Sequence, residues 1–369
     1  MLRLKGFIKE NVVMLIAAAC ALVTSFIVPP SEKYIEYFDF KTLSCLFCVL
    51  AVVCALRNIR FFYTLAKAIV RKFKNAKIAI LVLVYVTFIG SMLIANDMAL
   101  LTFLPLGYFI LHTTGKDKYM AFAFIMQNIA ANLGGMLTPF GNPQNLYLYT
   151  KFNIPDAEFV TIMLPPFLVS IALITACCLI FVKSEPLEIK EKAATLPIPR
   201  VLIYLVLFAL SILIVFRFIP FIVGLITIPL ALLFLDRQAL VDVDYGLLLT
   251  FVFFFIFAGN MSEIGVVRDF FSYLLSKNTF VFSALSCQLI SNVPSAILLS
   301  QFTDNYRELL LGVNIGGVGS MISSLASLIT LKEYAKQDPK HTLRYILKFS
   351  LYNFAFLIIL VVFCSFFAI

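Results

Sequence analysis

The chain has 369 residues, of which 62% are hydrophobic and only 13% are charged, and its formal net charge is +9. Its mean hydropathy of +1.00 lies far above that of soluble globular domains and excludes that class. The basic residues lie at the ends of apolar runs, so we expect no nucleic-acid partner. The composition therefore predicts an all-α polytopic protein of the cell membrane, whose main partner is the lipid bilayer.

About nine apolar runs approach the length of about 20 residues that a helix needs to cross the bilayer. In chain order they are Val12 to Val28, Leu43 to Ala55, Tyr119 to Leu137, Phe159 to Val182, Leu202 to Phe216, Ile222 to Leu235, Leu247 to Phe257, Leu309 to Ile329 and Tyr345 to Phe367. Most of the 29 lysine and arginine residues then fall on the side of the N-terminus. Positive residues concentrate in cytoplasmic loops, which predicts a cytoplasmic N-terminus and, after an odd number of spans, an outside C-terminus.

Two further apolar stretches, residues 78–111 and 279–302, have polar residues at their middles and charged residues near both ends. Each stretch predicts a re-entrant hairpin that enters the bilayer, turns at its polar tip and leaves on the same side. By the charge count, the first hairpin opens to the cytoplasm and the second to the outside. An amphipathic surface segment precedes each hairpin, at residues 59–73 and 262–275.

These segments recur in the same order in two halves, residues 1–182 and 201–369, which a cytoplasmic linker rich in proline and charge joins at residues 183–200. Corresponding positions, first half before second, are Asp39 and Asp244, Asn96 and Asn292, and Gly134 and Gly316. The odd number of spans in the first half inverts the second half. Inverted repeats can expose one shared site to opposite sides of the membrane, which is the basis of alternating access.

The span at residues 119–146 is broken by two prolines and three glycines after Asn132. Lipid cannot hydrogen-bond the backbone groups that such a break frees, so the break must line a cavity or a bound ion. The side chains that add oxygen and amide groups are Asn132, Thr138, Asn142, Gln144 and Asn145. Oxygen ligands suit hard cations, and half-helix N-termini suit anions. The alternative is a proline kink whose polar groups only satisfy the freed backbone.

The second broken span, residues 309–329, replaces the prolines with glycine and serine. Aligned on the Asn-x-Gly-Gly pattern that both breaks share, Ser320 corresponds to Thr138, Ser324 to Asn142 and Ser327 to Asn145. Small-residue helix packing is the alternative interpretation of these serines.

The predicted hairpin tips are Asn96-Asp97 and Ser291-Asn292. Asn, Asp and Ser cap helix N-termini, so capping alone could explain both tips. Asp97 needs more, because a carboxylate near the bilayer centre is costly unless a proton or a cation neutralises it. We therefore expect Asp97 to bind a proton or a cation.

These motifs resemble the ion transporter superfamily, which includes divalent-anion:sodium symporters, citrate carriers, arsenite permeases and some sodium/proton antiporters. The closest match is the break at residues 138–145, Thr-Pro-Phe-Gly-Asn-Pro-Gln-Asn. The resemblance implies an elevator-like carrier with a sodium ion between each tip and its broken span. The implied cation sites are Asn96, Gly134, Thr138 and Gly141 in the first half, and Ser291, Asn292, Ser320 and Ser323 in the second. The implied substrate contacts are Asn96, Asn142, Asn292 and Ser324.

Both tips depart from the Ser-Asn-Thr sequence that is common in this superfamily. The Asn-Asp tip is similar to that of arsenite permeases, which use the proton gradient. The favoured function is a secondary transporter that moves a small inorganic or carboxylate anion with sodium or protons. The alternative is a sodium/proton antiporter or an arsenite-type efflux permease that uses Asp97.

An intramembrane enzyme is not expected, because His112 and His341 lie at span ends, outside any zinc or Ser-His pattern. No cofactor is expected besides the coupling sodium ions or protons. The first span and residues 202–235 would form a scaffold, with a possible homodimer interface.

Overall fold

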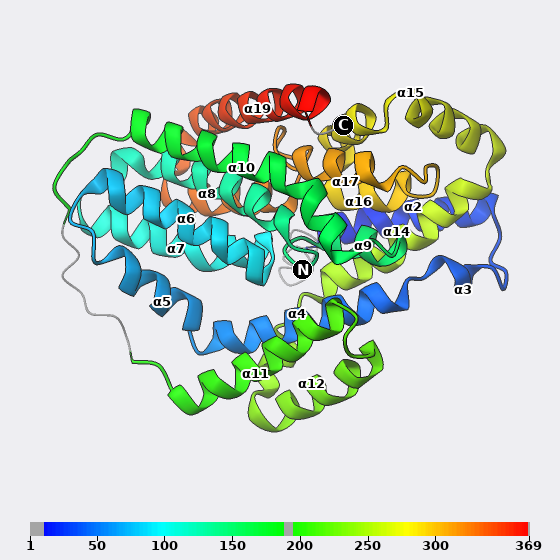
Figure 1. Cartoon of the computed structure of the whole chain (residues 1–369), viewed down its shortest axis with the longest axis horizontal. Coiled ribbons are helices and arrows are strands. Elements are labelled where there is room, and N and C mark those ends of the chain that lie inside the picture. Colours follow the sequence, from blue (N-terminus) through cyan, green and yellow to red (C-terminus); the bar gives the residue numbers. More distant parts are fainter. Residues whose placement is uncertain (1–10, 188–194, 368–369) are drawn as a thin grey trace.

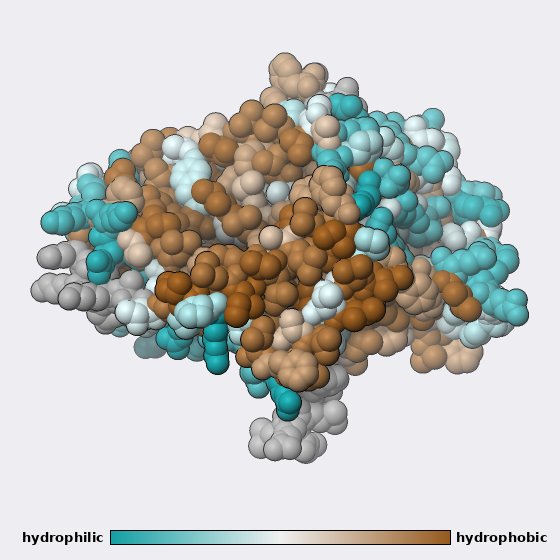
Figure 2. Space-filling view, turned by 60° about the horizontal axis from the view of Figure 1, so that its bottom comes forward, coloured by the Kyte–Doolittle hydropathy of each residue, from teal (hydrophilic) through white to brown (hydrophobic). Residues whose placement is uncertain are grey.

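The computed structural model describes residues 11–187 and 195–367, so both chain ends and the centre of the predicted linker, residues 188–194, lie outside the described residues. Within those ranges every regular element is a helix. Seven helices are long and apolar enough to cross a membrane, and three shorter apolar helices accompany them. Figure 2 shows hydrophobic side chains across the middle of one face, with hydrophilic side chains gathered at both ends. The prediction of a helical polytopic membrane protein is confirmed.

Figure 1 shows the arrangement of the helices. The first half contains α2 (Val12–Ile27), α3 (Tyr34–Tyr37), α4 (Phe40–Asn58), α5 (Phe61–Val70), α6 (Ala76–Ile94), α7 (Asn96–Thr113), η1 (Asp117–Tyr119), α8 (Met120–Gly134), η2 (Gly135–Leu137), α9 (Pro143–Lys151) and α10 (Asp156–Phe181). The second half contains α11 (Ile198–Val215), α12 (Phe221–Leu235), α13 (Arg237–Val241), α14 (Tyr245–Glu263), α15 (Gly265–Ile290), α16 (Asn292–Leu299), α17 (Tyr306–Ile315), α18 (Leu325–Gln337), η3 (Pro339–His341) and α19 (Thr342–Phe367).

Helices α4 and α14 each begin directly after an aspartate, and each packs against the other half of the chain. The side chain of Asp39 accepts a hydrogen bond from the Thr42 backbone N–H, and Asp244 accepts one from Leu247, both at 2.9 Å. Helix α4 packs against α11 and α12 of the second half, whereas α14 packs along α2 of the first. Each aspartate therefore caps a helix that contacts the other half of the chain.

The chain reverses direction at Ala95, so that α6 and α7 pack side by side (Figure 1). The two arms run from residue 76 to residue 113, slightly beyond the predicted stretch. Helix α6 alone has 19 residues, a length of about 28 Å, and it is one of the seven helices that could cross a membrane. Helix α6, the first arm of the predicted hairpin, is therefore long enough to cross the bilayer, which a short re-entrant arm does not need to be.

The second reversal occurs at Ser291, between α15 and the shorter helix α16. Helix α15 joins the predicted surface segment to the hairpin arm, whereas α5 and α6 are separate helices. Asn278 interrupts α15 with φ −167° and ψ 95°. Its side-chain oxygen accepts a hydrogen bond from the Val281 N–H at 2.7 Å and so caps the part of α15 that leads to the tip.

Both predicted breaks are present as gaps between helices. Helix α8 ends at Gly134 and α9 begins at Pro143, where proline suits the first helical position because that position has no intrahelical N–H bond to lose. Helix α17 ends at Ile315 and α18 begins at Leu325. We call residues 135–142 the first loop and residues 316–324 the second loop.

The start of the linker is attached to the helix bundle through Glu185. Its carboxylate accepts hydrogen bonds from Lys116 at 2.7 Å, from Lys118 at 2.5 Å and from the Tyr119 hydroxyl at 2.9 Å. These donors favour the charged form and lower the pKa of the Glu185 carboxyl to about 2. The linker is therefore fixed at this end by charge pairing.

Candidate functional site

The backbone is strained at both tips. The φ angle is 65° at Ala95 and 77° at Ser291, with ψ angles of 152° and 158°. This region is used almost only by glycine and costs other residues about 1–3 kcal/mol each. Strain of this kind persists where surrounding contacts hold it, and it is concentrated at functional sites.

The two loops hold the two tips through equivalent contacts. The Asn96 backbone N–H donates to the Gly141 carbonyl at 3.2 Å, and the Asn292 N–H donates to the Ser323 carbonyl at 2.9 Å. Each asparagine side-chain oxygen also accepts from the next backbone N–H at 2.9 Å. These contacts occur at positions that the alignment of the two halves pairs with each other.

Close glycine contacts repeat in the same way. A Cβ atom on Gly134 would lie 2.2 Å from the Phe88 carbonyl oxygen, and one on Gly316 would lie 2.9 Å from the Ala284 carbonyl oxygen. Only glycine therefore lets the end of each broken helix approach the first arm of its hairpin so closely.

Buried asparagines connect the halves between the loops. The Asn142 amide donates to the Asn314 side-chain oxygen at 3.3 Å, and the Asn314 amide donates to Asn145 at 2.6 Å. Asn132 accepts from the Asn96 amide at 3.1 Å. All five side chains are at least 97% buried, so their hydrogen bonds satisfy groups that are costly to bury unpaired.

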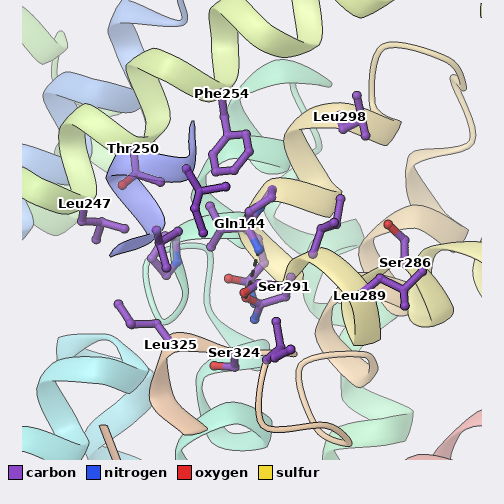
Figure 3. A pocket seen from close by; sticks show the side chains of 18 of the residues that line it. Gln144, Leu247, Thr250, Phe254, Ser286, Leu289, Ser291, Leu298, Ser324 and Leu325 are labelled. Atoms are coloured by element: carbon purple, nitrogen blue, oxygen red, sulfur yellow. Dashed lines mark hydrogen bonds between the residues drawn. The ribbon is translucent and has the colours of Figure 1, made fainter. Parts of the chain in front are cut away.

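A cavity of about 780 Å³ lies where the tips and loops meet. Its polar lining includes Asn96, Asp97, Gln144, Ser291, Asn292 and Ser324. Figure 3 shows Leu247, Thr250 and Phe254 of α14 on one side, with Gln144 and Ser291 reaching the interior. Both tips thus contribute to one cavity, which the mainly apolar helices α2, α14 and α15 enclose.

Four helix N-termini converge on this cavity. Helix α7 begins there at Asn96, α9 at Pro143, α16 at Asn292 and α18 at Leu325, and all four residues line the cavity. The N-terminal ends of helices carry a partial positive charge. Their convergence provides an environment that favours negative charge.

Asp97 places a carboxyl group in this cavity. Its Oδ1 atom is buried and has no hydrogen-bond partner, and no ion pair to it occurs within the described ranges. Asp244 and Lys332 line the same cavity, and neither is among the predicted site residues. A proton or a cation on Asp97 would remove the cost of burying this carboxylate.

The predicted site residues fall into two sets. Those that line the cavity are Asn96, Asp97, Ser291, Asn292 and Ser324. Those that lie in or beside the loops, outside the cavity lining, are Gly134, Thr138, Gly141, Asn142, Ser320 and Ser323. Asn142 is 1% exposed, and its Oδ1 atom has no partner, so it could contact a substrate only after a local rearrangement.

Several residues at the site were absent from the predicted set. Asn132 contacts the tip residue Asn96, and Asn145 and Asn314 join the two halves. The Gln288 side chain enters the second loop. The asparagines lie in the broken spans, so their position marked them as candidates. Gln288 is the only carboxamide residue between Thr279 and Ile290, which is the one signal that could have identified it.

The chain is similar in sequence to known proteins. The family model described as citrate transporter matches residues 3–307. The chain belongs to the citrate transporter family. An uncharacterized transporter of Methanocaldococcus jannaschii, MJ0456, is 33% identical over 320 residues, which is 86% of this chain and 88% of the relative. The inner membrane protein YbiR of Escherichia coli K12 is 27% identical over 319 residues, 84% of each chain. The resemblance to the ion transporter superfamily is confirmed, and this family member is a membrane transport protein.

Proposed function

We propose that this member of the citrate transporter family is a secondary active transporter that moves a small inorganic or carboxylate anion across the membrane. The observation that carries the proposal is the convergence of four helix N-termini on one cavity. The partial positive charges of these helix ends would stabilise the bound anion. Gln144 and Asn292 line the same cavity and add amide groups.

The same proposal includes alternating access of the elevator type. The paired tip contacts support two structural repeats. The distribution of Lys and Arg supports inverted topology, with hairpins that enter the bilayer from opposite sides and an N-terminus in the cytoplasm. The unit that moves would contain the tips and loops, and α2, α4, α11, α12 and α14 would form the static scaffold.

Asp97 is the proposed coupling site. An ionised carboxylate in the cavity repels an anion, so a proton or a cation must neutralise Asp97 for the anion to bind well. Each ligand then raises the affinity for the other by the same factor. Coupled transport follows, because the unneutralised site would bind the anion poorly.

A second candidate function is an antiporter for cations or an efflux permease for a metalloid. The observation that favours it is the presence of both Asp97 and Asp244 in the cavity lining. Two carboxylates in one cavity suit a cation better than an anion.

A thermal-shift screen of the purified protein tests the proposal. Citrate, phosphate and sulfate are the test anions, with citrate included because of the family description. We expect an anion to raise the melting temperature of the wild type but not that of Asn292→Ala. In proteoliposomes, Asp97→Asn should remove the pH dependence of anion uptake. Stabilisation by cations or arsenite alone, without any anion effect, would favour the second candidate.

A further inference from the structure

Donors from within the chain contact three carbonyl oxygens of the first loop. The Asn145 amide nitrogen lies 3.2 Å from each of the carbonyl oxygens of Gly135, Met136 and Thr138. This amide has two hydrogens, and the Thr138 carbonyl also accepts from the Gly141 backbone N–H at 3.2 Å. Asn145 is fully buried, so its amide is held at the point where these three carbonyls converge. Converging carbonyl oxygens are the usual ligands of a hard cation.

Different side chains donate to the backbone carbonyls of the second loop. The Gln288 amide nitrogen donates to the carbonyls of Gly316 at 2.8 Å and Val318 at 3.2 Å. The Ser323 hydroxyl, with its single hydrogen, lies 2.9 Å from the Gly317 carbonyl oxygen and 2.8 Å from that of Ser320. The Ser320 carbonyl also accepts from the Ser323 backbone N–H at 3.2 Å. Every carbonyl in this set therefore has a donor from the chain itself.

The residues that donate in one loop are not the counterparts of the residues that donate in the other loop. Asn145 corresponds to Ser327, whose side chain is shorter and whose hydroxyl is buried without a partner. Ser323 corresponds to Gly141, which has no side chain, and Gln288 corresponds to Met92, which has no amide. Corresponding carbonyls at three positions are nevertheless satisfied in both loops.

The sodium ions that the resemblance implies do not fit these loops. Gln288 fills the interior of the second loop, since a Cβ atom on Gly319 would lie 2.2 Å from the Gln288 side-chain oxygen. A cation would have to displace the amides of Asn145 and Gln288 to reach the carbonyl oxygens that they contact.

We propose that the amides of Asn145 and Gln288, with the Ser323 hydroxyl, take the place of coupling cations in the two loops. The tips are then ordered without sodium, and the coupling ion binds at Asp97. The assignment of coupling to Asp97 rests on the proposed function, whereas the filling of the loops does not.

The test compares melting temperatures of the purified full-length protein in sodium chloride and in choline chloride at equal ionic strength, without substrate. We expect the wild-type values to agree within about 1 °C. A saturable rise of several degrees in sodium would overturn the proposal, because it would show a sodium site in the native state.

Exchange variants carry the residue of the corresponding position in the other half. Asn145→Ser and Gln288→Met should each lower the melting temperature in choline by about 2 °C or more. Sodium should restore part of the loss in Gln288→Met, because carbonyl oxygens become available. Unchanged stability in choline, or no sodium effect on Gln288→Met, would contradict the assignment.

Hydrogen exchange in the wild type provides an independent measurement if the variants do not fold. Protection of residues 91–98 and 287–294 should be the same in sodium and in choline, and sodium-dependent protection would overturn the proposal. Because these measurements contain no anion, their outcome is separate from that of the anion screen, which tests the proposed function.

Discussion

Gly134→Ala should be a far more damaging methyl addition than Gly316→Ala at the corresponding position of the other half. The new Cβ atom would lie 2.2 Å from the Phe88 carbonyl oxygen, against an ordinary contact of 3.4 Å or more, so α6 and α8 must separate by about 1.2 Å. At Gly316 the contacts with Ala284 are 2.9 Å, which requires less than half that movement. Overpacking costs about 1–3 kcal/mol, and a backbone oxygen cannot rotate away as a side chain can.

We therefore expect a loss of about 3 kcal/mol for Gly134→Ala and about 1 kcal/mol for Gly316→Ala. At about 2 °C per kcal/mol, the melting temperature falls by about 6 °C and 2 °C. The chain has no tryptophan, so far-ultraviolet circular dichroism is the suitable probe. Gly265→Ala is the matched control, because nothing lies within 4 Å of its added Cβ. Equal melting temperatures for Gly134→Ala and this control, or a larger loss at Gly316, would refute the reasoning.

Three further predictions concern the cavity, the linker and the outer contact between helices. Asn292→Ala should weaken anion and coupling-ion binding together in isothermal titration, and loss of only one would argue against a shared site. Glu185→Gln should lower the melting temperature at pH 7. Because the native pKa of Glu185 is about 2 and its ordinary value is 4.5, this difference should persist above pH 4.5 and disappear as the pH falls toward 2. Arg217 donates to two backbone carbonyls near the end of α9, at 2.7 and 3.2 Å, so Arg217→Lys should lower the melting temperature by about 2–4 °C, with Arg237→Lys unchanged as the control.

Local signals in the sequence predicted much of the fold. Proline and glycine mark both breaks, because their effect on the backbone acts within a few residues. Asp39 and Asp244, which the repeat pairs with each other, are local signals of the same kind, since a cap bonds to its own first turn. The tips were also recognisable, as polar residues at the middles of apolar stretches.

Contacts between distant residues could not be predicted in this way. The bond from Asn142 to Asn314 joins the two halves, and a buried amide has no preference for one distant partner until the fold places it. The donors that satisfy the loops illustrate the same limit. An alignment pairs Asn145 with Ser327. In the structure, however, the side chains that donate to the carbonyls of the second loop are those of Gln288 and Ser323, which lie elsewhere in the chain.

The interruption of α15 at Asn278 has a mechanical consequence. The surface portion of α15 and the arm that leads to Ser291 are consecutive parts of one rod, whereas α5 and α6 are joined by a loop. If the second tip shifts, the displacement can be absorbed by rotation about the Asn278 backbone while each rigid portion keeps its shape. The second hairpin would then rotate about Asn278, a residue inside α15, whereas in the first half a loop separates α5 from the hairpin arm α6.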